Sequence, residues 1–145
     1  MRRSPTSDQL QVWRRFVETS AALNAAMASR MQASGVSAGD YAVMLALSEA
    51  PSLRSSELAV TVNWERSRLS HHLGRMEQRG LIRREECLTD NRGAEVALTP
   101  EGAELFRRAS APHMHAIQQL FASRLTTGQL AALDDAMRAL DDSGQ

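Results

Sequence analysis

The sequence predicts a mainly α-helical chain that contains one small β-hairpin. Two observations lead to this fold class. Apolar residues recur at i, i+3, i+4 and i+7 over long stretches, which is typical of helices with one buried face. Between residues 81 and 99 the period changes, because LIRREEC and AEVALT are short strand-like runs separated by the turn residues of LTDNRG.

The first helix is expected from Asp8 to about Ala33. Its apolar residues keep a near-heptad spacing: Leu10, Trp13, Phe16, Val17, Ala21, Leu23, Met27 and Met31. Such a stripe must be buried, either on its own domain or on a second copy of the chain.

The next elements are short. Ser37 and Asp40 match a capping box at the start of a second helix, which Pro51 ends. Leu53 is expected to add a short bridging strand. The run SSELAVTV, residues 55–62, then predicts a small helix capped by a serine.

Residues 64–80, WERSRLSHHLGRMEQRG, predict a helix with two different faces. Glu65 is expected to cap its start, and Gly80 stands where a helix usually stops. One stripe is mainly apolar: Leu69, His72, Leu73 and Met76. The other faces carry hydrogen-bond donors: Arg66, Ser67, Arg68, Ser70, His71 and Arg75.

After the hairpin, Pro100 at a first helical position predicts a helix that runs to about Leu125, kinked or interrupted at Pro112. Thr126 and Gln129 match a capping box for a final helix. The narrow apolar stripe of that helix suggests an interface: Leu130, Leu133, Met137 and Leu140.

The charge of the chain is balanced overall but unevenly distributed. Its 145 residues fit a single domain, residues 1–145, and the formal net charge is zero with 17 basic and 17 acidic residues. A globally basic coat is therefore excluded. However, six arginines and two glutamates lie between Trp64 and Arg84, which predicts a local footprint for a polyanion.

Several classes of protein are disfavoured by what the sequence lacks. Cys87 is the only cysteine, which rules out an internal disulfide and fits a reducing compartment. The sequence shows neither the apolar core of a signal peptide nor a run of roughly 18 apolar residues. No phosphate loop or nucleophile motif is present. We expect a cytoplasmic protein with no membrane partner, no cofactor and no enzymatic activity.

The central elements follow the order of a winged helix-turn-helix: short helix, tight turn, arginine-bearing helix and a hairpin with Arg92 at its tip. In such a lobe the arginine-bearing helix enters a major groove of DNA and the hairpin flanks it. The alternative is a solvated helix and an ordinary surface turn, since arginine-rich helix faces are common on soluble proteins.

These residues resemble the multiple antibiotic resistance regulator (MarR) family of bacterial transcription factors. The resemblance is carried by SSELA, by WERSRLSHHLGRMEQRGLIRRE, by the wing tip DNRG and by VALTPEG. It covers roughly residues 8–142 and is strongest from Arg54 to Gly102.

The resemblance implies a homodimer that binds double-stranded DNA. Residues 8–35 and 100–142 would supply the dimerisation helices, and residues 37–99 the winged lobe. The expected function is a ligand-responsive repressor on a pseudo-palindromic operator, with half-sites about 10 base pairs apart. The alternative is a winged-helix module that docks onto proteins and has no operator of its own.

Carried over residue by residue, the resemblance implies base and phosphate contacts for Ser67, Arg68, Ser70 and His71. Arg75 is an expected phosphate contact, and Arg66 follows the same logic. Arg92 matches the wing arginine that enters the minor groove, and Asp90 matches the acid that orients it.

A small aromatic effector is a further implication of the resemblance. The candidate binding residues are Trp13, Phe16, Tyr41, Met44 and His113, and the alternative is that all five are core. No metal site is predicted, because the adjacent His71 and His72 diverge on a helix. Cys87 follows two glutamates, which raise a thiol pKa, so redox sensing is not favoured.

Overall fold

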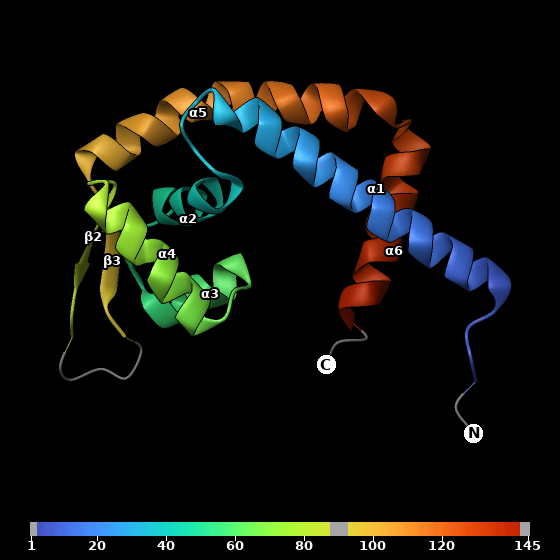
Figure 1. The fold of residues 1–145 in the computed structure, drawn as a ribbon, viewed down its shortest axis with the longest axis horizontal. Coiled ribbons are helices and arrows are strands. Elements are labelled where there is room, and N and C mark those ends of the chain that lie inside the picture. The colour runs from blue at the N-terminus through green and yellow to red at the C-terminus, as the bar shows by residue number, and fades with distance from the viewer. Residues whose placement is uncertain (1–2, 88–92, 143–145) are drawn as a thin grey trace. The chain divides into compact units, whose positions relative to one another are not determined.

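The computed structural model describes residues 3–87 and 93–142, which are mostly helical with a small antiparallel sheet (Figure 1). The predicted fold class is confirmed. The elements in chain order are α1 (Ser7–Gln32), α2 (Ala38–Ser48), β1 (Leu53–Arg54), α3 (Ser55–Val62), α4 (Arg66–Gln78), β2 (Ile82–Glu85), β3 (Glu95–Leu98), α5 (Pro100–Leu120), the 3-10 helix η1 (Ala122–Arg124) and α6 (Thr127–Asp142).

The chain divides into two compact units. The central unit is Ala28–Pro112, and the terminal unit combines Met1–Met27 with His113–Gln145. The sequence predicts a DNA-binding lobe over residues 37–99 between dimerisation helices. Those functions stay predictions.

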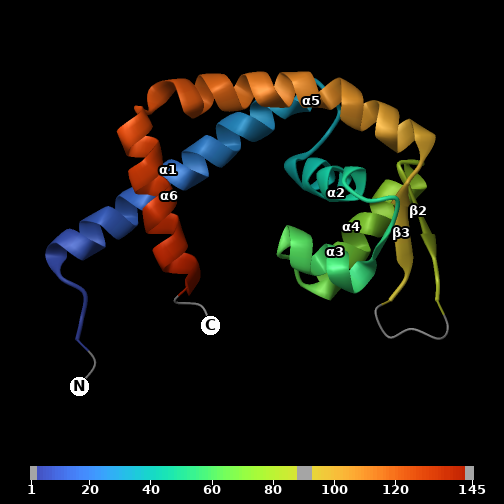
Figure 2. The same cartoon turned by 180° about the vertical axis from the view of Figure 1, so that it is seen from behind.

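The sheet of the central unit has the strand order β1-β3-β2, and both pairs are antiparallel. Val96 at its centre pairs with Leu53 on one side and with Arg84 on the other. The bridging strand predicted at Leu53 is therefore confirmed. Figures 1 and 2 both show α2, α3 and α4 grouped beside this sheet.

The core of the central unit lies between these helices and the sheet. It takes fully buried side chains from four elements: Met44, Leu58, Leu69, Leu73, Met76 and Val96. Burying side chains of this size contributes about 1.5–3 kcal/mol each. The core therefore holds α3 and α4 in a fixed relation to the hairpin.

Two helix starts are set by capping boxes, as predicted. Before α2, the Ser37 hydroxyl accepts a hydrogen bond from the Asp40 N–H at 3.0 Å, and the Ser37 N–H donates to the Asp40 carboxylate at 3.1 Å. Before α6, Thr126 and Gln129 exchange the equivalent pair at 2.9 and 3.1 Å. Each box supplies side-chain acceptors for two backbone N–H groups at the start of its helix.

Three local predictions are wrong. The N-cap of α3 is Arg54, with no side-chain capping bond, because the extended chain of β1 leads directly into the helix. Helix α5 is not interrupted at Pro112, and the alternative of a kink there stays a prediction. A proline removes one backbone hydrogen bond of a helix, and this loss does not end α5.

Helix α5 also ends earlier than predicted, at Leu120 rather than about Leu125. Leu125 is extended, with φ −114° and ψ 137°, directly before the capping box of α6. An N-cap residue has non-helical dihedral angles, so a helix cannot run through it. The chain therefore leaves the helix through η1.

The terminal unit exposes much of its apolar surface in the single chain. The exposed large side chains of α1 and α6 are Leu10, Val12, Trp13, Phe16, Val17, Leu130, Met137 and Leu140.

Within the described ranges, none of the helices combines the length and apolar character needed to cross a membrane.

Candidate nucleic-acid interface

A tight turn at Asn63 joins α3 to α4. Asn63 has φ 56° and ψ 47°, a left-handed conformation that asparagine adopts more readily than most residues. Its N–H donates to the Val60 carbonyl at 3.2 Å, and the Trp64 N–H donates to the Ala59 carbonyl at 3.0 Å. These bonds close α3, so that α4 begins three residues after the turn.

Helix α4 ends at a Schellman motif, as Gly80 predicts. Gly80 has φ +75°, and its N–H donates to the Glu77 carbonyl at 3.0 Å. The Leu81 N–H donates to the Met76 carbonyl, also at 3.0 Å. At the other end Glu65 holds the N-cap position, but its side chain makes no capping bond, so the predicted cap is right in position only.

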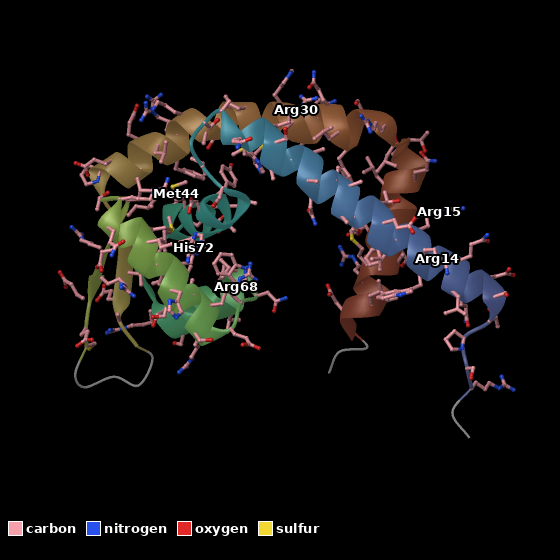
Figure 3. The ribbon with its side chains drawn as sticks, in the orientation of Figure 1. Arg14, Arg15, Arg30, Met44, Arg68 and His72 are labelled. Carbon is pink, nitrogen blue, oxygen red and sulfur yellow. The ribbon has the colours of Figure 1, made fainter. Side chains whose placement is uncertain are left out.

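The two faces predicted for α4 are observed. Leu69, Leu73 and Met76 are buried, and His72 is partly buried beside them. The exposed residues include all six predicted DNA contacts of the helix: Arg66, Ser67, Arg68, Ser70, His71 and Arg75. Figure 3 labels Arg68 and His72 on this helix. The structure thus presents hydrogen-bond donors on one side and is docked through the other.

A buried carboxylate ties α4 to the start of α2. Asp40 is 4% exposed, and its two oxygens bond different residues of α4 and its C-cap: His72 Nε2 at 2.9 Å and Arg79 Nη1 at 2.8 Å. Arg79 also donates to the Gly35 carbonyl at 3.0 Å. The network thus fixes α4 relative to the α1–α2 connection as well as through its apolar stripe.

Hydrogen-bond chemistry sets the tautomer of His72. Arg75 Nη2 lies 3.2 Å from His72 Nδ1, and a guanidinium only donates. Nδ1 must therefore accept the hydrogen bond from Arg75, and Nε2 carries the hydrogen of the bond that it donates to Asp40. His72 thus links the exposed Arg75 to the buried Asp40.

The Asp40 carboxylate stays charged although it is buried. Burial by itself raises the pKa of the Asp40 carboxyl, but hydrogen bonds from His72, Arg79 and the Ser37 backbone outweigh it and hold that pKa well below its usual range. The negative charge of Asp40 is therefore a permanent part of the packing between α2 and α4 near neutral pH.

The hairpin is attached to α4 through Arg84. Its guanidinium donates to Glu77 Oε1 at 3.2 Å and to the Ser70 carbonyl at 3.5 Å. Arg84, one of the six arginines of the basic stretch, therefore holds the hairpin to α4. The predicted wing contacts, Arg92 and Asp90, lie outside the described residues.

The predicted effector residues are divided between the two units. Tyr41 and Met44 are core residues of the central unit, where the Tyr41 and Phe106 rings lie 5.3 Å apart. In the terminal unit Trp13 and Phe16 are exposed in the single chain. Burial lowers the pKa of the half-buried His113. A shared effector site stays a prediction.

Sequence reasoning missed two features. It assigned Asp40 to the capping box alone, and it did not foresee that Arg68 stacks on Trp64, with its guanidinium carbon 4.2 Å from the ring centroid. The i, i+4 spacing of tryptophan and arginine was the available signal. Among the described residues, no three His, Cys, Asp or Glu side chains are placed to hold a metal ion.

Comparisons with known proteins agree with this geometry. The model of the MarR family matches residues 36–93, which contain α2 to β2. The transcriptional regulator HosA of Escherichia coli O157:H7 is 35% identical over 86 residues. That alignment covers 59% of this chain, and the chain spans 63% of the length of the curated relatives it matches.

Two solved structures from Streptomyces coelicolor are similar over almost the whole chain. AbsC, a MarR family transcriptional regulator, superposes with a TM-score of 0.90 at 32% identity, covering 99% of this chain and 100% of AbsC. Sco3205, a MarR family transcriptional regulator solved in complex with DNA, gives a TM-score of 0.91 at 35% identity, covering 99% of this chain and 91% of Sco3205.

Proposed function

Because the chain belongs to the MarR family, we propose that it is a transcriptional regulator that binds double-stranded DNA as a homodimer. The observation that carries this proposal is the orientation of α4. The helix is held in the central unit by Asp40 and its apolar stripe, and its hydrogen-bond donors face solvent. The 35% identity to a regulator solved with DNA supports the same function.

The outward face of α4 suits a major groove. A groove of B-DNA about 12 Å wide admits one helix, and arginine offers a planar fork of donors to guanine or phosphate. In this proposal Ser67, Arg68, Ser70 and His71 meet bases and phosphates. Arg66 and Arg75 extend the contact along the helix.

The wing completes the proposed contact. Arg92 would enter the minor groove next to the segment read by α4, and Asp90 would orient it. The described part of the hairpin supports this placement, because Arg84 fixes β2 to α4. A wing held in this way would keep its position relative to α4.

The proposed dimer rests on the terminal unit. Leu10, Trp13 and Val17 follow one side of α1 and, with Arg14 and Glu18, line a groove of about 360 Å³. Trp13 is 63% exposed and Leu10 51%. A contiguous apolar face of this kind marks an interaction surface, and a second copy of the chain would cover it through the helices of residues 8–35 and 100–142.

A two-fold dimer would present two copies of α4 about one helical turn of DNA apart. Any signal that stabilises another spacing of the two helices would weaken both half-sites together. A small aromatic effector acting this way needs a coupling of about 1–3 kcal/mol between its site and DNA. We therefore propose a ligand-responsive repressor that acts in the cytoplasm and is not an enzyme.

Selection from random duplex DNA by the purified chain tests this function. We expect enrichment of a pseudo-palindromic sequence whose affinity falls steeply with salt. Arg92→Ala should weaken binding to the selected duplex at least threefold, a change of about 0.7 kcal/mol or more, whereas Arg124→Ala on η1 should not. Failure to enrich any sequence would favour the protein-docking module instead.

A further inference from the structure

Arg68 is held against an aromatic ring on the proposed DNA-binding face. Its guanidinium carbon lies 4.2 Å from the centroid of the Trp64 ring. Trp64 directly precedes the N-cap of α4, and Arg68 lies in the first turn of that helix. Tryptophan offers the most favourable ring face for a cation–π contact, and arginine is the cation found there more often than lysine.

The Trp64 ring is itself fixed from two sides. Its ring and that of His72 meet edge to face, with centroids 5.1 Å apart and planes at 76°. On α2, a Cβ added to Gly39 would lie 3.0 Å from the Trp64 ring and 2.9 Å from the His72 ring. Both rings therefore pack where only a glycine leaves room.

This packing connects Arg68 to the buried anchor of α4. Asp40 holds His72 at 2.9 Å, His72 contacts Trp64, and Trp64 supports Arg68. The two ends of the series differ in exposure, since Asp40 is 4% exposed while Arg68 faces solvent. The exposed Arg68 is thus connected by side-chain contacts to a buried hydrogen-bond network.

Given the proposed function, on which this inference rests, we propose that Trp64 is a positioning residue that pre-organises Arg68 for DNA. An unrestrained arginine loses side-chain rotamer entropy when it is fixed in a complex. Stacking removes part of that loss before binding, and it leaves the N–H edge of the guanidinium available to guanine or phosphate. Trp64 would therefore raise affinity without touching DNA.

The competing role for Trp64 is packing alone, because the ring also lies against the core cluster. The two roles differ in how Trp64 and Arg68 depend on each other. If Trp64 acts through Arg68, its replacement has no effect once Arg68 is gone. If Trp64 acts through the fold, its replacement has the same effect in both backgrounds.

A double-mutant cycle on the full-length chain measures this dependence. The variants are Trp64→Leu, Arg68→Ala and the pair, and the probe is a duplex recovered by selection with the wild-type chain. We expect Trp64→Leu to weaken binding about threefold to tenfold in the wild-type background. In the Arg68→Ala background the same change should alter binding by less than about twofold.

Two further variants separate stacking from charge and from stability. Trp64→Phe keeps an aromatic face and should restore part of the lost affinity, whereas Arg68→Lys keeps the charge but not the planar group and should bind less tightly than the wild type. Leu98→Ala, which loosens the same core away from Arg68, controls for destabilisation.

Each outcome decides between the roles. Equal losses from Trp64→Leu in both backgrounds, or tighter binding by Trp64→Leu, would overturn the inference, the latter because the stack would then be holding Arg68 away from DNA. If the wild-type chain selects no duplex, the proposed function fails before the cycle begins. If it selects a duplex and the losses are equal, only the role of Trp64 fails.

Discussion

Helices α4 and α1 each carry an apolar stripe, but the stripe of α4 is buried within the chain, whereas that of α1 is exposed along much of its length. Leu69 and Met76 are at most 1% exposed, whereas Trp13 is 63% exposed and Phe16 46%. Helical spacing reveals where the stripe lies on a helix, and it does so equally well for both. What covers the stripe is a separate question, decided by tertiary and quaternary structure.

The difference separates two kinds of stability. The central unit has its own core and should unfold as a unit whose stability does not depend on concentration. The terminal unit would owe much of its stability to a second copy, so concentration enters its unfolding. A substitution confined to one unit should therefore change the stability of that unit and leave the other unchanged.

The largest effect is expected from the core of the central unit. Met76→Ala removes a fully buried side chain from α4 and should lower the free energy of unfolding by about 2–5 kcal/mol. Val60→Ala, at a residue 82% exposed on α3, should change it by less than about 0.5 kcal/mol. Urea denaturation at two protein concentrations measures both, and similar losses would mean that burial does not govern this unit.

A matched pair of glycines gives the next effect. A Cβ at Gly102 would lie 2.0 Å from the Leu81 carbonyl oxygen, so Gly102→Ala should cost about 3 kcal/mol or more. At Gly128 on α6 the nearest atom is 4.0 Å away, and Gly128→Ala should stabilise the helix by about 0.5 kcal/mol. Thermal unfolding distinguishes them, and a tolerated alanine at Gly102 would contradict the close packing described.

Asp40 adds a pH-dependent contribution to the central unit. Asp40→Asn removes the charge that pairs with Arg79 and should cost about 1.5–3 kcal/mol at pH 7. Because the folded-state pKa of Asp40 lies below its ordinary value of 3.8, the contribution is complete above that pH and is lost as the pH falls below it. The difference between wild type and variant should therefore shrink in acid.

Denaturant titrations from neutral pH to about pH 2 follow this loss. The control is Asp134→Asn in the terminal unit, whose exposed pairing with Arg138 at 2.9 Å should contribute little at any pH. An Asp40→Asn difference that stays constant in acid would show that the carboxylate is not responsible.

The smallest of the four effects concerns the terminal unit. Trp13→Ser removes an exposed aromatic side chain from α1 and should weaken self-association at least about tenfold, or 1.4 kcal/mol. The unfolding of the central unit should be unaffected. Sedimentation equilibrium measures the association, and an unchanged dissociation constant would place the interface elsewhere.

Local chemistry made much of the fold predictable. The pairs Ser37–Asp40 and Thr126–Gln129 identify helix starts, because a capping box is satisfied by residues three apart. Gly80 identifies the end of α4 for a similar reason. The donor face of α4 follows from its periodicity.

The parts that were not predictable depend on distant residues. The partners of Asp40 in α4 and its C-cap are 32 and 39 residues away, and nothing in a capping box indicates them. The end of α5 at Leu120 depends on the start of the next helix, which propensity within α5 does not reveal. The exposure of Trp13 is equally invisible, because the spacing of a stripe is the same whether a core or a second chain covers it.

In the proposed complex, two chains act together on one duplex, each through its α4. Sedimentation velocity of the chain mixed with its selected duplex, over a range of salt concentrations, tests this most directly. The expected result is a complex of two chains per duplex that dissociates as salt rises. A complex of one chain per duplex, or no complex at low salt, would rule out a dimer that binds DNA through two copies of α4.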